Sequence, residues 1–462
     1  MKRLILSASL VLGVTALFAA PPKYVLLFIG DGMSTPQRMI AEEYAIKTGK
    51  GEILANHLKY HATTRTCSSS SLVTDSAAAA TAIACGTKTY NGALGVDPDG
   101  KRLESIAEVA HKHGKKVGLV TTVTICHATP SGFYAHRKNR GLGYQIGLDL
   151  IASGFEYFAG GGMGGQADKK DDPEYRGNIY ELAAKEGGYK VVRNKAELMA
   201  TQPGQKVFGP MTEDAMPFSI DNPGDDTIPT LAELTAKGIE LLDNPNGFFM
   251  MVEGGKIDYA GLANDAATNL GEMLAFDQAI RVGYDFYKKH PNETLIMVTG
   301  DHETGGMAMG FAGTGYALYM DRLANQKCSK DVFAQTIKKM RKDNPSLTFE
   351  DVVPLLKEKF GFIFDQVDDA SDAKKVKEGK VDPMALNKDE LKKLKDAFAA
   401  KGNQLPDAAK QIISAKAGIG WTSGAHTALP ALTTSEGLYA DRFVGLMDNT
   451  DISNRLKAMY EE

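Results

Sequence analysis

Short apolar runs alternate with amphipathic helical patterns along this chain, and this alternation restricts the possible fold more than any other feature. Continuous apolar runs predict strands that are covered on both faces, because a strand with one wet face would alternate apolar and polar residues. The amphipathic segments predict the helices that cover those faces. The predicted strands are 23–30, 115–124, 247–252 and 293–300, and the predicted helices are 103–114, 229–243 and 269–290.

These elements predict an α/β fold with a central, mostly parallel sheet sandwiched by helices. The chain has 462 residues, 43% of them hydrophobic, which is enough to bury a large core around such a sheet. Its net charge of -4 lacks the basic surplus of a nucleic-acid-binding protein, so no nucleic-acid partner is expected.

Residues 1–20 have the three-part pattern of a secretory signal peptide: two basic residues, an apolar run, and small residues before Pro21. We therefore expect a periplasmic or secreted protein. Leu17 or Phe18 stands where a small residue is preferred before the cleavage site, which leaves an uncleaved anchor as the alternative. No later apolar run is long enough to span a membrane, so no span is expected in the mature chain.

Export would permit disulfides between the four cysteines of the chain. Four cysteines allow three full pairings, and four free buried thiols are the alternative. The spacing of the cysteines does not choose among these possibilities. The cysteines are Cys67, Cys85, Cys126 and Cys328.

Acidic residues and histidines follow three of the predicted strands. In a parallel sheet, ligands bind beyond the carboxyl ends of the strands, so these side chains are expected to meet at one edge. A single aspartate there is usually a turn or cap residue, but a cluster beside a buried sheet needs cations to neutralise it. Mixed carboxylate and imidazole ligands favour zinc, or a hard divalent ion where oxygens dominate. The candidates are Asp31, Glu253, Asp258, Asp301 and His302, with His426 in a small-residue loop near the C-terminus.

Ser76 begins an alanine-rich helical run that ends at Gly86. As an N-cap such a serine is ordinary. As a functional group it is a hydroxyl beside backbone N–H groups suited to an anion, and a metal could activate it as a nucleophile. Thr129 could be a turn residue and Arg140 a solvated cation, yet an arginine near such a serine has the planar fork that fits two phosphate oxygens.

Six motifs, in order and across most of residues 24–460, resemble the alkaline phosphatase family. The resemblance implies the family's central parallel sheet between helices, usually in a homodimer. It implies hydrolysis of small phosphate monoesters through a phosphoserine, with two zinc ions and a third site that commonly holds magnesium. The motifs are "DGMS", "VTDSAAAATAIACGTKT", "HATPSG", "VEGGKID", "VTGDHETGG" and "SGAHT".

The resemblance also implies a role for each matching residue. Ser76 would be the nucleophile, Arg140 would clamp the phosphate, and Asp75 would orient Arg140. One zinc would be held by Asp31, Asp301 and His302, and the other by Asp258 and His426. The third metal would be held by Thr129 and Glu253, with Asp31 bridging to it.

Two residues depart from the family pattern. His127 stands where many members have an aspartate near the third metal and others have a histidine, which leaves the identity of that metal open. Leu262 stands four residues after Asp258, on the same side of a helical turn, where the family has a zinc-binding histidine. Catalytic zinc typically has three protein ligands, so the second zinc is in doubt. We expect the leucine itself to pack inward.

Three explanations of Leu262 remain open from sequence. Another residue could supply the missing ligand of the second zinc, or the leucine could slow or block dephosphorylation. The protein could also act with the remaining metals alone. The candidates for a substitute ligand are His57, His61, His136 and Asp265.

Residues 313–418 have charged amphipathic patterns with lysine-rich faces and interrupt the strand pattern. We interpret them as a helical insertion, with the α/β domain formed by 21–312 and 419–462. The resemblance implies a crown that shapes the mouth of the site and the dimer contact, and a solvated appendage is the alternative.

Two other functions remain possible at this stage. A related hydrolase would act on phosphodiesters or sulfate esters, although the intact "TDSAAA" favours monoesters and the C-x-P-x-R context of sulfatases is absent from the sequence. A phosphate-binding or regulatory protein would retain the fold and lose turnover through Leu262.

Overall fold

A ten-stranded sheet forms the centre of the protein, in the order β14-β2-β13-β8-β1-β7-β3-β4-β6-β5. The computed structural model describes residues 21–222, 224, 226–311, 313–400 and 402–461, so the predicted signal peptide lies outside the described residues. Every pairing between described strands of this sheet is parallel except those of β13, which confirms the predicted fold class. The strands are β1 (Tyr24–Gly30), β2 (Tyr60–Arg65), β3 (Lys116–Thr124), β4 (Tyr157–Gly161), β5 (Tyr189–Val191), β6 (Lys206–Pro210), β7 (Phe248–Gly254), β8 (Thr294–Gly300), β13 (Ala431–Gly437) and β14 (Gly445–Asp448).

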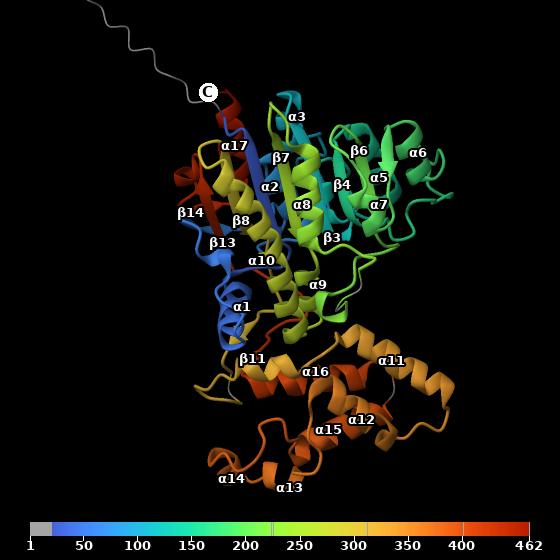
Figure 1. The fold of residues 1–462 in the computed structure, drawn as a ribbon, viewed down its shortest axis with the longest axis vertical. Helices are drawn as coiled ribbons and strands as arrows, with labels where there is room; N and C mark the ends of the chain where they lie inside the picture. The colour runs from blue at the N-terminus through green and yellow to red at the C-terminus, as the bar shows by residue number, and fades with distance from the viewer. Residues whose placement is uncertain (1–20, 223, 225, 312, 401, 462) are drawn as a thin grey trace, which may run out of the picture.

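Helices cover both faces of the sheet (Figure 1). One face packs against α1 (Thr35–Lys47), α8 (Leu231–Leu242) and α10 (Ala266–Lys289). The other face packs against α2 (Ser76–Cys85), α3 (Ile106–Lys112), α5 (Gly143–Ser153), α6 (Ile179–Lys185) and α17 (Thr450–Glu461). Shorter helices lie in the connections: α4 (Ala128–Ser131), α7 (Lys195–Met199), α9 (Lys256–Leu262), η1 (Leu54–Asn56), η2 (Ser219–Asp221) and η4 (Ala440–Arg442).

The central strand β1 shows why the strand sequences are apolar throughout. Its alternate residues Leu26 and Phe28 enter the core under α1, α8 and α10, whereas Leu27 and Ile29 enter the core on the opposite face. All four side chains are fully buried. Because successive side chains of a strand point to opposite faces, a strand between two helical layers must be apolar at every position.

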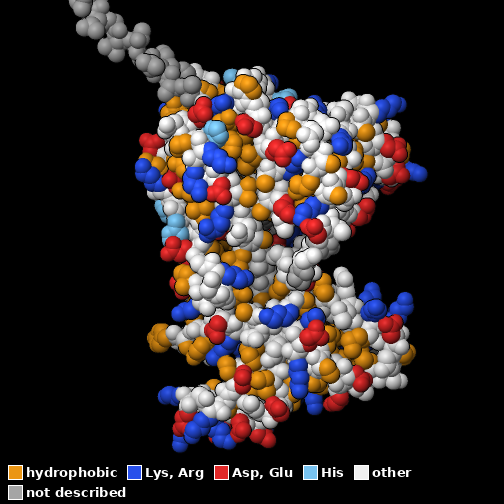
Figure 2. All heavy atoms as spheres, in the orientation of Figure 1, with side chains coloured by type: hydrophobic (Ala, Val, Ile, Leu, Met, Phe, Trp, Pro, Cys, Tyr) orange, Lys and Arg blue, Asp and Glu red, His pale blue; other side chains and the backbone are white. Residues whose placement is uncertain are grey.

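Residues 313–418 form a helical layer beyond one end of the sheet (Figure 1), and the surface narrows between this layer and the α/β body (Figure 2). Apolar residues of these helices, such as Phe333 and Leu356, continue the core that lies under α1 and α10. The predicted domain division stays a prediction. The elements are η3 (Met320–Asn325), α11 (Lys330–Asp343), α12 (Phe349–Phe360), α13 (Val367–Ala370), α14 (Ala373–Lys377), α15 (Lys388–Ala399) and α16 (Gln404–Ala417).

Two short strand pairs connect the helical layer to the sheet. β10 (Ala308–Met309) pairs with β11 (Ile419–Gly420), and β9 (Glu303–Thr304) pairs with β12 (His426–Thr427). The second pair places His426 directly opposite Thr304, which lies four residues after the end of β8.

All four cysteines lie within the described residues and all four are free thiols, as in the alternative without disulfides. Cys85, Cys126 and Cys328 are buried, but Cys67 is half-buried, so the expectation that all four are buried was wrong for Cys67. Across the described ranges, the helices are either too short or too polar to cross a membrane.

Candidate active site

Three neighbouring strands deliver acidic side chains to one edge of the sheet. Asp31 follows β1, Glu253 lies near the end of β7, and Asp301 follows β8. The sheet order places β1 between β8 and β7, with Gly30 in register with both Gly254 and Gly300. Parallel strands in this register end together, so the carboxylates meet beyond their carboxyl ends, as predicted.

Asp31, Asp301 and His302 form the first of three groups of possible metal ligands, and the Ser76 hydroxyl faces this group. The Oγ of Ser76 lies 3.1 Å from Nε2 of His302 and 3.5 Å from Oδ1 of Asp31. Nε2 of His302 in turn lies 3.3 Å from Asp31 and 3.2 Å from Asp301. Backbone N–H groups of Gly32 and His302 donate to Oδ1 of Asp301 and hold that carboxylate in place.

The helix α2 positions Ser76. Its N-cap, Asp75, accepts a hydrogen bond from the backbone N–H of Ala78, and the helix ends at Gly86 with a φ of 75°. Ser76 is the first helical residue and is only 2% exposed. The unsatisfied N–H groups and the dipole of the helix therefore favour an anion beside this hydroxyl.

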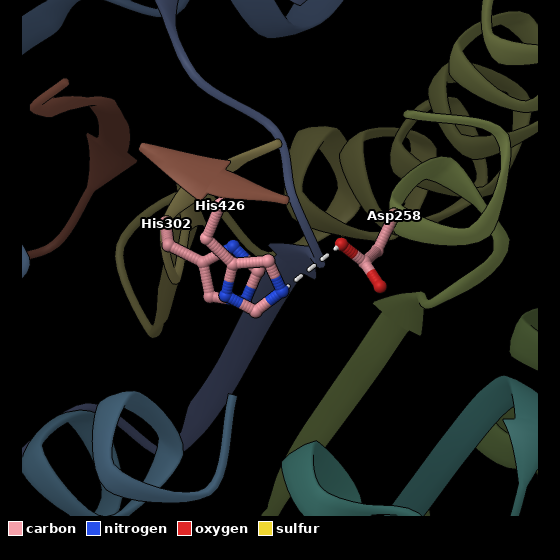
Figure 3. Close-up of side chains that lie close together, drawn as sticks. All are labelled: Asp258, His302 and His426. Atoms are coloured by element: carbon pink, nitrogen blue, oxygen red, sulfur yellow. Dashed lines mark ion pairs between the residues drawn. The ribbon is translucent and has the colours of Figure 1, made fainter. Parts of the chain in front are cut away.

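Asp258, His302 and His426 form a second group (Figure 3). Asp258 lies in α9, which directly follows β7, and its Oδ1 is 3.5 Å from Nε2 of His426. The rings of His302 and His426 stack with their centroids 3.6 Å apart. Nδ1 of His426 lies 2.8 Å from the carbonyl oxygen of Thr74, which only accepts hydrogen bonds, so Nδ1 carries the proton. The lone pair of a neutral His426 is then on Nε2, toward Asp258.

Thr304 links the two groups, and the sequence interpretation did not select it. Its hydroxyl donates to Oδ1 of Asp258 at 2.5 Å and lies 3.3 Å from Nδ1 of His302. Because the single hydroxyl proton goes to Asp258, the oxygen accepts from Nδ1–H of His302. Nε2 of His302 is thereby left with its lone pair toward Asp31, Asp301 and Ser76. The position of Thr304, two residues after His302 in "GDHETGG", was the sequence feature that could have identified it.

A third group contains Asp31, His127 and Glu253. Thr129 lies 3.4 Å from Oδ2 of Asp31, and Nδ1 of His127 lies 3.9 Å from the same oxygen. Glu253 accepts a hydrogen bond from Thr121. These side chains contribute mainly oxygen atoms to the group.

Arg140 lies beside this third group. Its Nη1 is 3.1 Å from Asp75, and its Nη2 is 3.1 Å from Nε2 of His127. Arginine only donates, so Nε2 of His127 accepts and Nδ1 of the neutral ring carries its proton. Burial lowers the pKa of His127 to about 3, which keeps the ring neutral. The ring also contacts Tyr259 edge-on, a second residue that the sequence interpretation did not select.

The electrostatics of the site fit cations. Burial first, and then the neighbouring carboxylates, raise the pKa of Asp31 well above its usual range. Burial likewise raises the pKa of Asp301 far above normal and that of Glu253 to about 7. Within the described part of the chain, Oε1 of Glu253 and Oδ2 of Asp301 are buried without a hydrogen-bond partner. Each of the three groups has donor atoms within 4.8 Å of one another, so the residues present suit bound metal ions.

The stability of the metal-free protein is expected to fall as the pH rises from about 4 to about 7. Folded Glu253 keeps its proton over this range, whereas the unfolded chain loses it, so the folded state binds more protons. The free energy of unfolding should therefore decrease, by about 3 kcal/mol for a shift of this size. Urea denaturation of chelator-treated protein at several pH values measures the effect. The Glu253→Gln variant should show a weaker dependence, and an unchanged dependence would contradict this assignment.

Leu262 does not pack inward as predicted, because its side chain is 40% exposed. It is the last residue of α9, where the helix meets solvent beside the loop that contains Gly424. The four candidates for a substitute ligand have other surroundings. His57 contacts Glu42, His136 contacts Glu108, Asp265 caps α10, and His61 lies on β2 opposite Thr434.

The fold and this site define a class: metal-dependent hydrolases in which a serine at a helix N-terminus faces buried carboxylates and histidines that could hold metal ions, at the carboxyl edge of a mostly parallel sheet. Comparison with known proteins identifies the family within this class. The alkaline phosphatase family model matches residues 22–461, and the chain belongs to that family. Its reaction is the hydrolysis of phosphate monoesters, which makes this protein a phosphoric monoester hydrolase.

Relatives match over nearly the whole chain. Alkaline phosphatase 3 of Bacillus subtilis is 32% identical, over 95% of this chain and 89% of its own length. The crystal structure of a cold-active alkaline phosphatase from Shewanella sp. has a TM-score of 0.80 and 28% identity, covering 95% of this chain and all of that one. A variant of the TAB5 alkaline phosphatase, solved with Mg bound in its M3 site, has a TM-score of 0.65 and 25% identity, covering 96% and 99%.

Proposed function

We propose that the protein hydrolyses phosphate monoesters to an alcohol and inorganic phosphate, with the phosphoryl group carried transiently on Ser76. The observation that carries this proposal is the position of the Ser76 hydroxyl, 3.1 Å from His302 and 3.5 Å from Asp31 at the start of a buried helix. A hydroxyl held among metal-ligand side chains can attack phosphorus without a separate histidine base.

The donor sets suggest which residues hold each metal. A zinc ion suits Asp31, Asp301 and His302, because the lone pair of His302 Nε2 faces both carboxylates. A second zinc suits Asp258 and His426. A magnesium ion suits the oxygens of Asp31, Thr129 and Glu253, with His127 beside them. When bound, such ions lower the pKa of a hydroxyl or a water and neutralise charge on the phosphoryl oxygens.

Arg140 is proposed to bind the phosphoryl group. Asp75 holds one end of its guanidinium, and the side chain is 30% exposed, so donors remain that can reach an incoming anion. The planar fork of arginine matches two phosphate oxygens at once. The N-terminus of α2 lies next to Ser76 and favours the same anion.

Hydrolysis of a chromogenic phosphomonoester with added zinc and magnesium tests the proposal. Turnover, together with phosphate found on Ser76 after an acid quench, is the expected result. Absence of turnover with stable phosphate on Ser76 would favour a second candidate, a phosphate-trapping protein. Leu262 favours that candidate, because it supplies no ligand to the group of Asp258 and His426. Absence of both would contradict the proposed function.

Thr304 is predicted to support metal binding without contacting the metal. Its hydroxyl orients both Asp258 and His302, so Thr304→Val should lower zinc affinity about tenfold or more, the effect usual for an outer-shell partner. Competition with a zinc-binding dye measures the affinity. Thr304→Ser keeps the hydroxyl and should bind zinc nearly as well as the native chain. Equal losses in both variants would indicate a packing effect instead.

We also propose that the mature protein is periplasmic or secreted and forms a homodimer, as the resemblance implies, with residues 313–418 shaping the mouth of the site and the dimer contact. A second part of the proposed contact lies outside that segment: an apolar hollow of about 500 Å³ is lined by Pro36, Met39, Met307, Met309 and Leu429 among others, and it is the candidate surface for a second copy.

Leu429→Lys should convert this proposed dimer to a monomer. Leu429 is 44% exposed, and a lysine there would place like charges together in a two-fold interface. Light scattering after gel filtration measures the mass. Leu446→Lys, at a leucine of 73% exposure on the edge strand β14, should stay dimeric. A Leu429→Lys dimer would exclude this surface as the contact.

A further inference from the structure

Three exposed apolar side chains lie on two segments that border the group of Asp258 and His426. Leu262 is 40% exposed, Leu72 is 76% exposed and Val73 is 38% exposed. Single exposed leucines are ordinary on protein surfaces, but these three flank one site. We call Leu72, Val73 and Leu262 the apolar rim.

The loop that carries His426 holds both segments of the apolar rim. On one side, the side-chain amide of Asn264 donates to the carbonyl of Ser423 at 2.8 Å and to that of Gly261 at 2.9 Å. These bonds tie the end of α9 to the loop. On the other side, Nδ1 of His426 donates to the carbonyl of Thr74 at 2.8 Å.

Hydrogen bonds also fix the segment that precedes the nucleophile. Asn91 donates from its amide to the carbonyl of Val73 at 3.1 Å and accepts from the backbone N–H of Asp75 at 3.3 Å. The exposed side chains of Leu72 and Val73 are therefore presented by an anchored backbone.

The direction of Leu262 follows from helix geometry. Residues four apart in a helix lie on the same face, so Leu262 projects on the side of α9 that carries Asp258. Asp258 points toward His426 (Figure 3). An apolar side chain thus lies one helical turn from Asp258, at the solvent side of the site.

We propose that the apolar rim binds the leaving group, so that the enzyme prefers phosphate monoesters of apolar alcohols and phenols. This inference rests on the proposed function, in which Ser76 attacks and Arg140 holds the phosphoryl group. Of two metal groups in an in-line displacement, one serves the attacking oxygen and the other the leaving oxygen, so we assign the ester oxygen to the group of Asp258 and His426. The carbon chain beyond that oxygen then leaves the site between Leu262 and the segment of Leu72 and Val73. Covering these side chains removes apolar surface from water, which favours an apolar leaving group over a polar one.

Two substrates of equal tether length and similar leaving-group acidity test the proposal: 3-phenylpropyl phosphate and 3-hydroxypropyl phosphate. The native enzyme should favour the first in kcat/KM by about tenfold, as expected for burial of about 60 Å² of apolar surface. Leu262→Ala and Leu72→Ala should each lower this ratio about threefold. Leu446→Ala, a leucine of 73% exposure on β14, should leave the ratio unchanged.

A binding measurement separates failure of this inference from failure of the proposed function. The corresponding phosphonates, which resist hydrolysis, are titrated into protein supplemented with zinc and magnesium. Tighter binding of the phenylpropyl compound, weakened in Leu262→Ala, supports the rim even in a chain without turnover. A kcat/KM ratio near one or equal affinities for the two phosphonates would overturn the rim alone. No binding of either phosphonate would overturn the proposed phosphate site and the rim together.

Discussion

Ser76→Ala is expected to lower kcat for a phosphomonoester by at least about a thousandfold, because the substitution removes the hydroxyl proposed to carry the phosphoryl group. The substitution removes a single oxygen and keeps a good helix former at the first position of α2. The fold and the metal content should therefore persist. Steady-state rates with zinc and magnesium, metal counting and circular dichroism measure these three properties.

A matched control exists in α16. Ser414 is also a buried helical serine, 3% exposed, and its hydroxyl has no hydrogen-bond partner among the residues that the structure describes. Ser414→Ala should keep full turnover and lose little or no stability, because no hydrogen bond is broken. If Ser76→Ala kept turnover within tenfold of the native rate, Ser76 would not be the nucleophile. If both variants lost turnover, a general effect on folding would be the cause.

Leu262→His is expected to raise zinc affinity at the group of Asp258 and His426 by at least about tenfold, since even outer-shell partners of a metal change affinity by about 10- to 100-fold. The new imidazole would lie on the same helical face as Asp258 and supply the third protein ligand of a usual catalytic zinc. The exposed position of Leu262 leaves room for the ring. Dye competition and the number of zinc ions per chain measure the change.

Leu262→Phe is the matched control, because it changes size without adding a ligand, and its zinc affinity should stay near the native value. An increase in turnover in Leu262→His alone would show that the native second site limits the reaction. Unchanged zinc affinity in Leu262→His would show that the native chain already has a third ligand. The surroundings of His57, His136 and Asp265 argue against those residues.

Local patterns predicted most of the fold. The strands at 23–30 and 293–300 and the helix at 229–243 match β1, β8 and α8 within a few residues. Their boundaries follow from side-chain periodicity and from caps such as Thr230, which a sequence displays directly. The alanine-rich helix after Asp75 likewise begins and ends where its cap and its glycine indicate.

Near neighbours in the chain were enough to predict the α/β fold with helices on both faces of its sheet, the residues at its strand ends and the absence of a third ligand four positions after Asp258. Three features emerge only in the folded protein: Thr304 links Asp258 to His302, Asn264 fastens α9 to the loop of His426, and Leu262 is exposed. The two contacts join segments that are far apart in sequence, and the exposure of Leu262 depends on which segments cover the end of α9. Strand order and packing create them, and neither is encoded in local periodicity.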